Sequence, residues 1–291
     1  MPSDELQMTP APFGMPVKRP VEPILSDGYL CQISARVSCG ACCGLYNVAD
    51  ASRSALTALL SQRTKRFAGV PRTVAAILRF KMELQQEEAQ SRPLPDFHHC
   101  PYLGLVGRHR RTVGCMLHPI EPANGGRDFR SLSYYGGMAC HIFFCSATRL
   151  LPARHKEIIR AVVNDWYLYG LIITEVKLLK ALFSELEDRL GRPLYPKEFI
   201  DHPQRRTALY GLLLLRVSWP FRDPARHHLV HYFFNDHRQP RPAIAACGQG
   251  HAIQRYHTIL EELETEAHTE ADLRRAEVYL DDKIRQVLEA F

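Results

Sequence analysis

The chain lacks a long hydrophobic run. None of its 291 residues lies in an uninterrupted apolar stretch of about 18, the length that a membrane-spanning helix requires. The longest candidate, Leu212–Leu215, is far too short. The first residues also lack the basic start and apolar segment of a secretory signal, and are rich in proline instead. We therefore expect a cytoplasmic protein with no membrane partner.

Several catalytic signatures are also missing. The sequence has no GxSxG elbow for a serine nucleophile, no HExxH zinc motif and no CxxxCxxC triplet of the kind found in radical S-adenosylmethionine enzymes. The net charge is +6, but no lysine–arginine block accompanies it, so nucleic acid is not an expected partner. We interpret the arginines between residues 205 and 226 as surface residues around a buried aromatic core, and the histidines between 227 and 237 as one exposed, histidine-rich helix face.

What the chain does have is cysteine. Nine cysteines without an export signal indicate a reducing compartment, where clustered thiols bind metal more often than they form disulfides. The densest run is Ser-Cys-Gly-Ala-Cys-Cys-Gly, residues 38–44, in which Cys39 and Cys42 have the spacing of a metal-binding turn. Cys43 is an awkward partner for Cys42 on one ion, because neighbouring side chains point in different directions. This vicinal pair therefore suits a site with more than one metal atom.

Further cysteines lie far downstream, in His-His-Cys-Pro-Tyr-Leu-Gly, Gly-Cys-Met-Leu-His-Pro and Ala-Cys-His-Ile-Phe-Phe-Cys. Turn-forming or small residues flank each one, as the loops of a metal site require. With the opening run and one earlier cysteine, the predicted ligands are Cys31, Cys39, Cys42, Cys43, Cys100, Cys115, Cys140 and Cys145. Cys247 stands alone, and we interpret it as a small buried apolar residue.

The ligand chemistry leaves the metal open. Soft thiolates favour zinc, copper(I) or iron–sulfur clusters. Eight thiolates fill two closed zinc sites, and a [4Fe–4S] cluster takes four cysteines, one on each iron. His118 and His141 each lie close to a cysteine, where they could replace a thiolate on zinc or orient one through a hydrogen bond. Arg127, Arg130, Tyr134 and Tyr135 could line a small polar pocket near the metal, although simple loop packing explains them better.

The order of these motifs resembles the YkgJ-type cysteine-cluster family, whose CxxCxxCC signature is described as chelating zinc or iron. Flagellin lysine N-methylases look like distant members of that family. The resemblance covers Cys31 to Cys145 and implies a metal-binding cysteine-cluster protein that holds an iron–sulfur cluster or zinc. As an alternative, it implies an iron–sulfur-dependent protein-modifying enzyme, such as a protein lysine N-methylase, that acts on a protein substrate. The chain departs from the signature at Cys31, which stands eight residues before Cys39.

The predicted fold class is mainly α: a loop-rich cysteine-cluster domain followed by a helical domain. We expect an extended proline-rich leader over residues 1–27, the cysteine-cluster domain over 28–150 and the helical domain over 151–291. Apolar residues at helical spacing predict a helical insert at about 51–90, with helices over 52–67 and 73–90. The same spacing predicts one long helix from Pro152 to Gly191, a second over 203–219, a third over 223–234, and one or two more over 253–291. The glycine- and proline-rich segment 100–145 has no core of its own, so bound metal is expected to hold it.

Overall fold

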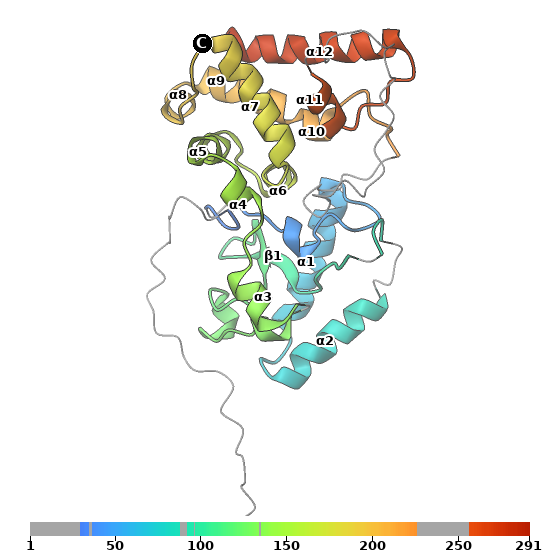
Figure 1. The fold of residues 1–291 in the computed structure, drawn as a ribbon. Coiled ribbons are helices and arrows are strands. Elements are labelled where there is room, and N and C mark those ends of the chain that lie inside the picture. The colour runs from blue at the N-terminus through green and yellow to red at the C-terminus, as the bar shows by residue number, and fades with distance from the viewer. Residues whose placement is uncertain (1–29, 35–36, 88–91, 96, 134, 226–255) are drawn as a thin grey trace, which may run out of the picture.

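The computed structural model describes residues 30–34, 37–87, 92–95, 97–133, 135–225 and 256–291. This part of the chain is mainly helical with two short strands, as the sequence predicts. The last helices gather at one end of the molecule, and the helical insert lies at the other (Figure 1). None of the described helices combines the length and apolar character needed to cross a membrane. The predicted leader lies outside the described residues.

The helical insert forms as predicted, from α1 (Arg53–Ala68) and α2 (Val74–Glu87). Ser52 begins α1, because its hydroxyl accepts a hydrogen bond from the amide three residues later. Phe67 and Phe80 join the two helices, edge to face, with ring centroids 5.0 Å apart.

A two-stranded antiparallel hairpin, β1 (Leu103–Val106) and β2 (Thr112–Cys115), rests against α1. The hydroxyl of Thr64 on α1 accepts a hydrogen bond of 2.8 Å from the Leu105 amide. The hairpin and its flanks enter a core shared with α1 and α2, through Tyr102, Leu103, Leu105, Val113, Met116 and Leu117. The expectation that metal must hold the whole of segment 100–145 is therefore wrong for its first part, because the helical insert supplies a core for the hairpin.

The region predicted as one long helix forms three: α5 (Ala153–Val162), α6 (Trp166–Ile172) and α7 (Val176–Leu190). The single-helix prediction is wrong because the Asp165 carboxylate accepts hydrogen bonds from the amides two and three residues later. A side chain in that position caps a new helix and competes with continuation of the old one. Gly191 ends α7 with φ of 68°, as the sequence predicts.

The short helix α4 (Ala147–Leu150) precedes α5. After α7 come α8 (Lys197–Ile200), α9 (Pro203–Leu213), α10 (Leu215–Ser218), α11 (His257–Glu262) and α12 (Glu270–Leu288), of which α9 and α12 are the longer ones. The second predicted helix thus divides into α9 and α10. Two helices form at the end of the chain, in line with the sequence. Most of the predicted helix over 223–234 lies outside the described residues.

Two of the arginines predicted to lie on the surface are buried. Arg216 and Glu175 pair at 3.3 Å with neither side chain exposed. Arg222 donates a hydrogen bond to the Leu263 carbonyl and pairs with Glu264 at 3.3 Å. The surface interpretation is wrong for these two because carboxylates and carbonyls inside the helical half satisfy the guanidinium groups, as buried charges require. They are structural residues and offer nothing to nucleic acid.

The two halves share their cores across the predicted boundary at residue 150. Trp166 and Leu171 of α6 pack in the core of the cysteine-rich half, whereas Leu30 and Val37 pack in the core of the later helices. Tyr46, just after the vicinal cysteines, is fully buried and donates a hydrogen bond of 2.9 Å to the Tyr167 carbonyl on α6. The cysteine loop is therefore anchored on the helical half.

We expect Gly170→Ala to weaken this junction. A Cβ on Gly170 would lie 2.2 Å from the Tyr46 hydroxyl oxygen, and Tyr46 cannot retreat without losing its hydrogen bond to α6. Overpacking of this kind costs ~1–3 kcal/mol, measurable as a lower free energy of unfolding in urea. The matched control is Gly211→Ala in α9, where a Cβ meets nothing within 4 Å. Equal effects of the two substitutions would contradict the proposed contact.

Candidate metal centre

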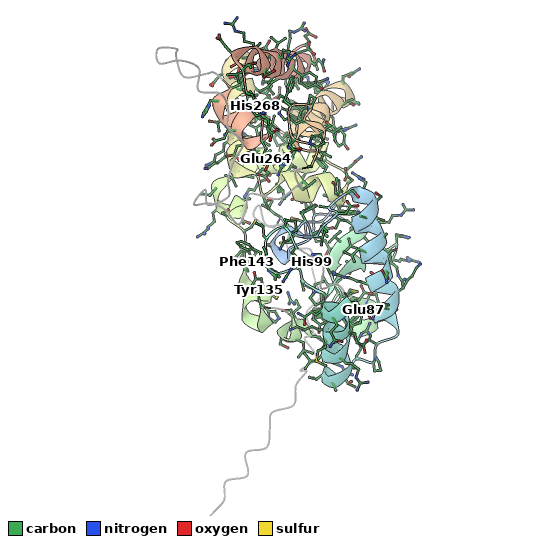
Figure 2. The ribbon with its side chains drawn as sticks, turned by 90° about the vertical axis from the view of Figure 1, so that its right-hand side faces the viewer. Glu87, His99, Tyr135, Phe143, Glu264 and His268 are labelled. Carbon is green, nitrogen blue, oxygen red and sulfur yellow. The ribbon has the colours of Figure 1, made fainter. Side chains whose placement is uncertain are left out.

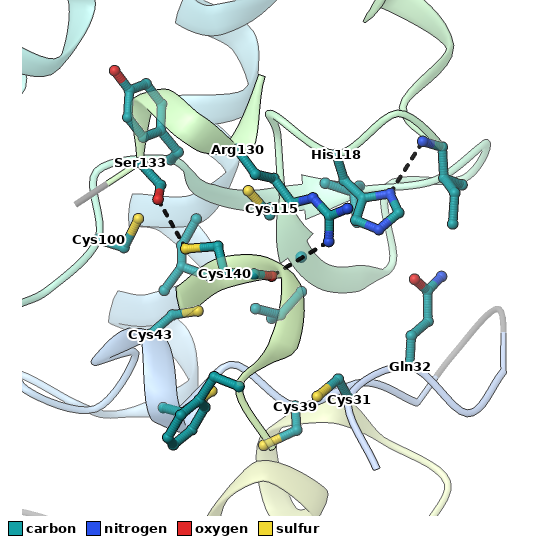
Figure 3. A pocket seen from close by; sticks show the side chains of 18 of the residues that line it. Cys31, Gln32, Cys39, Cys43, Cys100, Cys115, His118, Arg130, Ser133 and Cys140 are labelled. Carbon is teal, nitrogen blue, oxygen red and sulfur yellow. Dashed lines mark hydrogen bonds between the residues drawn. The ribbon is translucent and has the colours of Figure 1, made fainter. Parts of the chain in front are cut away.

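One cavity of about 490 Å³ collects seven of the eight predicted ligands (Figure 3). They are Cys31, Cys39, Cys42, Cys43, Cys100, Cys115 and Cys140. The eighth, Cys145, is buried and does not line this cavity. None of the eight forms a disulfide in the structure. The fold therefore brings together cysteines from the beginning, middle and end of the cysteine-rich region.

The vicinal cysteines lie in a 3-10 helix, Ala41–Cys43. Because such a helix has three residues per turn, adjacent side chains diverge by ~120°. Gly44 ends the turn with φ of 79°, in the left-handed region that favours glycine, and its amide donates a hydrogen bond to the Ala41 carbonyl. The side chains of Cys42 and Cys43 therefore leave the backbone at different angles, while their thiols stay within hydrogen-bonding reach of each other.

The segment that carries Cys100 crosses directly over this turn. The Cys100 amide donates a hydrogen bond of 2.9 Å to the Cys43 carbonyl, and His99 Nδ1 lies 2.6 Å from the Gly44 carbonyl oxygen. The Leu103 amide in turn bonds the Cys100 carbonyl, and Leu103 stands opposite Cys115 in the hairpin. Short backbone links thus connect Cys43, Cys100 and Cys115.

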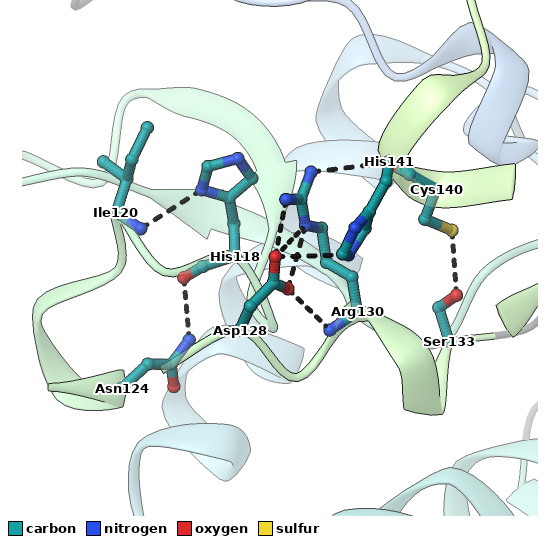
Figure 4. A network of polar contacts seen from close by, with 8 residues as sticks. All are labelled: His118, Ile120, Asn124, Asp128, Arg130, Ser133, Cys140 and His141. Atoms are coloured by element: carbon teal, nitrogen blue, oxygen red, sulfur yellow. Dashed lines mark hydrogen bonds and ion pairs between the residues drawn. The ribbon is translucent and has the colours of Figure 1, made fainter. Parts of the chain in front are cut away.

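Cys140 is carried by α3 (Gly136–Ile142) and is held by polar neighbours (Figure 4). The Ser133 hydroxyl lies 2.8 Å from its sulfur, and Arg130 donates a hydrogen bond of 3.3 Å to its carbonyl. Asp128 fixes the Arg130 guanidinium at 2.6 Å and pairs with His141 at 3.2 Å. Burial works against the charge of Asp128, but the hydrogen bonds from Arg130 prevail and hold the pKa of this carboxyl below its usual range.

Cys31 and Cys39 are joined by their backbones. The Cys39 amide donates a hydrogen bond of 2.7 Å to the Cys31 carbonyl, and Gln32 pairs with Ser38 in an isolated antiparallel bridge. Cys145 belongs to the core of the helical half, and Cys39 packs against that same core. This face of the centre is therefore built on the later helices.

Burial disfavours the thiolate form of two of the cavity cysteines. Burial raises the pKa of Cys31 and of Cys115 to about 12. Cys42 differs, because a hydrogen bond from the Cys43 thiol lowers its pKa. Thiolates are the metal-binding form, so metal binding at this centre releases protons.

The two histidines near the cysteines, His118 and His141, already have polar partners in the protein. His118 lines the cavity, and its Nδ1 accepts a hydrogen bond of 3.1 Å from the Ile120 amide. The neutral ring then carries its proton on Nε2, where it is a donor instead of a metal ligand. His141 also lines the cavity and pairs with Asp128. Both arrangements favour hydrogen bonding to the centre over direct ligation.

The thiols surround the cavity without closing on one point. Among the described residues, no group of three or more His, Cys, Asp and Glu side chains is arranged to hold a metal ion as it stands. Cys247 and the histidines at 227–237 lie outside the described residues.

Ser133, Asp128, Phe143 and Phe144 lie at this site but were not predicted from the sequence, because they have no recognisable spacing relative to the cysteines. Phe143, Phe144 and Tyr135 line the cavity with about half of each side chain exposed (49%, 53% and 53%; Figure 2), so the cavity reaches the surface beside an aromatic rim. Of the four residues considered above as pocket residues, Arg130 and Tyr135 line the cavity and Arg127 does not, whereas Tyr134 lies outside the described residues.

Acid is expected to destabilise this half of the protein. Burial lowers the pKa of His98 and of His118 to about 4, and that of His99 to about 3, from the ordinary 6.5. These rings stay neutral when folded but are protonated in the unfolded chain below about pH 6.5, so stability is lost as the pH falls from about 6.5 towards 4. Urea unfolding at about pH 7.5 and pH 5 measures this, and His98→Gln should flatten the dependence. A free energy of unfolding that rises on acidification would contradict it.

No protein-family model matches this chain, and no curated protein or solved structure shows significant similarity to it. The resemblance to the cysteine-cluster family therefore stays a prediction, supported by the order of the motifs alone.

Proposed function

We propose that this protein binds metal through cysteine thiolates, as an iron–sulfur cluster or zinc centre in the cysteine-lined cavity. The observation that carries the proposal is the convergence of seven predicted ligands on one cavity from segments far apart in the sequence. The donor set is soft and sulfur-rich, which suits iron–sulfur clusters and zinc and does not suit magnesium or calcium.

The size of the cavity favours more than one metal atom. A volume of about 490 Å³ is many times the ~30 Å³ that one water molecule occupies. A polynuclear cluster, or two metal centres, uses this space and this ligand set better than one ion does.

Metal analysis of cysteine variants tests the proposal. Protein purified without oxygen should contain bound metal, and Cys100→Ser should lose at least half of it, because Cys100 lies at the crossing with the vicinal turn. Cys247→Ser, outside the predicted ligand set, is the matched control and should keep it all. Wild-type protein that contains no metal, or an equal loss of metal in both variants, would contradict the proposal.

A second candidate is an iron–sulfur-dependent enzyme that modifies a protein, such as a lysine N-methylase. The exposed rim of Tyr135, Phe143 and Phe144 favours it, because a purely structural metal site has no need of an open cavity. Calorimetric titration of S-adenosylmethionine into anaerobically purified protein tests this candidate. Heat of binding that is lost in Phe143→Ala would support it, and no heat with the wild type would count against methyl transfer.

A further inference from the structure

We infer that the eight thiols form two separate four-thiolate metal sites and that the vicinal pair is divided between them. The first quartet is Cys31, Cys39, Cys42 and Cys145, and the second quartet is Cys43, Cys100, Cys115 and Cys140. The inference rests on the proposed metal-binding function and goes beyond it, because it assigns each ligand to a site.

The second quartet is assembled by the insert and the hairpin. The hydrogen bond from the Cys100 amide to the Cys43 carbonyl, followed by the hairpin register, places Cys43, Cys100 and Cys115 together. Cys140 enters from α3, and its sulfur lies beside the Ser133 hydroxyl. Figure 3 shows these four cysteines around one part of the cavity.

The first quartet is assembled on the helical half. The backbone hydrogen bond between Cys31 and Cys39 places them side by side, and Figure 3 shows them at the other end of the cavity. Cys145 is buried in the core against which Cys39 packs. This location explains why Cys145 is the one predicted ligand that does not line the cavity with the others.

Four thiolates are the complete ligand set of a closed zinc site and of a [4Fe–4S] cluster. Either centre fits each quartet, and both displace the thiol protons on binding. The 3-10 turn makes the division possible, because its backbone turns by ~120° from one residue to the next. The hydrogen bond from the Cys100 amide holds Cys43 beside the hairpin, which leaves Cys42 for the quartet on the helical half.

Titration with ¹¹³Cd²⁺, a probe for thiolate sites, tests the division on the full chain after anaerobic removal of its metal. We expect two equivalents bound per chain and two cadmium resonances with shifts typical of four sulfur ligands. Cys42→Ser should abolish or shift one resonance and Cys43→Ser the other, although the residues are adjacent. Cys39→Ser should affect the same resonance as Cys42→Ser, and Cys115→Ser the same resonance as Cys43→Ser, so each quartet is tested at two positions. Only variants whose circular dichroism shows intact helices are compared.

The possible failures are distinct. One equivalent of cadmium, or Cys42→Ser and Cys43→Ser acting on the same resonance, would overturn the two-site arrangement while leaving the proposed function in place. No cadmium bound by the wild type would overturn both.

Discussion

Gly44→Ala is expected to dismantle the cysteine-lined cavity. A Cβ at this position would lie 2.0 Å from the His98 carbonyl oxygen and 2.9 Å from His99 Cα, both of which are backbone atoms that no rotamer change can move. The φ of 79° adds the strain of a left-handed conformation. Relief requires the crossing segment to move away, which breaks the hydrogen bond between Cys100 and Cys43. We expect a loss of ~3–5 kcal/mol in stability and a loss of bound metal.

Gly125→Ala is the matched control for this experiment. Gly125 also has a left-handed backbone, with φ of 58°, but nothing lies within 4 Å of a Cβ built there. Its replacement should cost ~1 kcal/mol, from the backbone alone, and leave metal content unchanged. Urea unfolding and metal analysis of both variants give the comparison. Equal losses would show that the close approach at Gly44 does not matter.

Removal of the metal is expected to loosen residues 118–145 far more than the rest of the chain. Within this stretch, the described residues form the short helices at Pro122–Asn124, Arg130–Leu132 and α3, and contribute little to either apolar core. Bound thiolates at Cys140 and Cys145 would then supply much of the order. Hydrogen exchange followed by mass spectrometry should show amides in 118–145 exchanging ~10-fold or more faster after chelation under reducing conditions, equivalent to ~1.4 kcal/mol of lost protection.

The helix α12 provides the internal control in the same experiment. It buries Leu273, Ala276, Leu280, Ile284 and Val287 in the core of the helical half and should keep its protection. Amides at the contact between α1 and the hairpin should change their exchange rates less than amides in 118–145, because an apolar core holds that contact. Unchanged exchange in 118–145 after verified loss of metal would show that metal does not order these loops.

The set of clustered cysteines could be predicted from the sequence, because the spacing of thiols along the chain is a local and chemically specific signal. Cys39, Cys42 and Cys43 can be recognised from their high local density alone. The downstream cysteines can be recognised because glycine and proline lie near them. The proposed assignment of each cysteine to one of two groups could not be predicted. It depends on a crossing of backbones at Gly44 and on the burial of Cys145 against helices that begin after it.

Helices of the insert were predictable for a similar reason, since apolar spacing and an N-cap serine coincide there. The prediction of one long helix was wrong because the apolar periodicity continues past Asp165. The Asp165 side chain caps a new helix there, so the first helix does not continue. The burial of Arg216 could not be predicted either. Its partner Glu175 lies 41 residues away in the sequence, and only the tertiary fold brings the two together. Local signals thus identified the candidate cysteines, and tertiary contacts determine how they are arranged.

X-ray absorption at the metal edge of protein purified without oxygen tests the central claim most directly. If the thiols of this cavity hold the metal, the nearest shell around it consists of sulfur, at ~2.3 Å in the case of zinc. That shell should lose intensity in Cys43→Ser and remain intact in Cys247→Ser. A shell of nitrogen and oxygen, or protein that contains no metal and eight freely titratable thiols at these positions, would contradict the account.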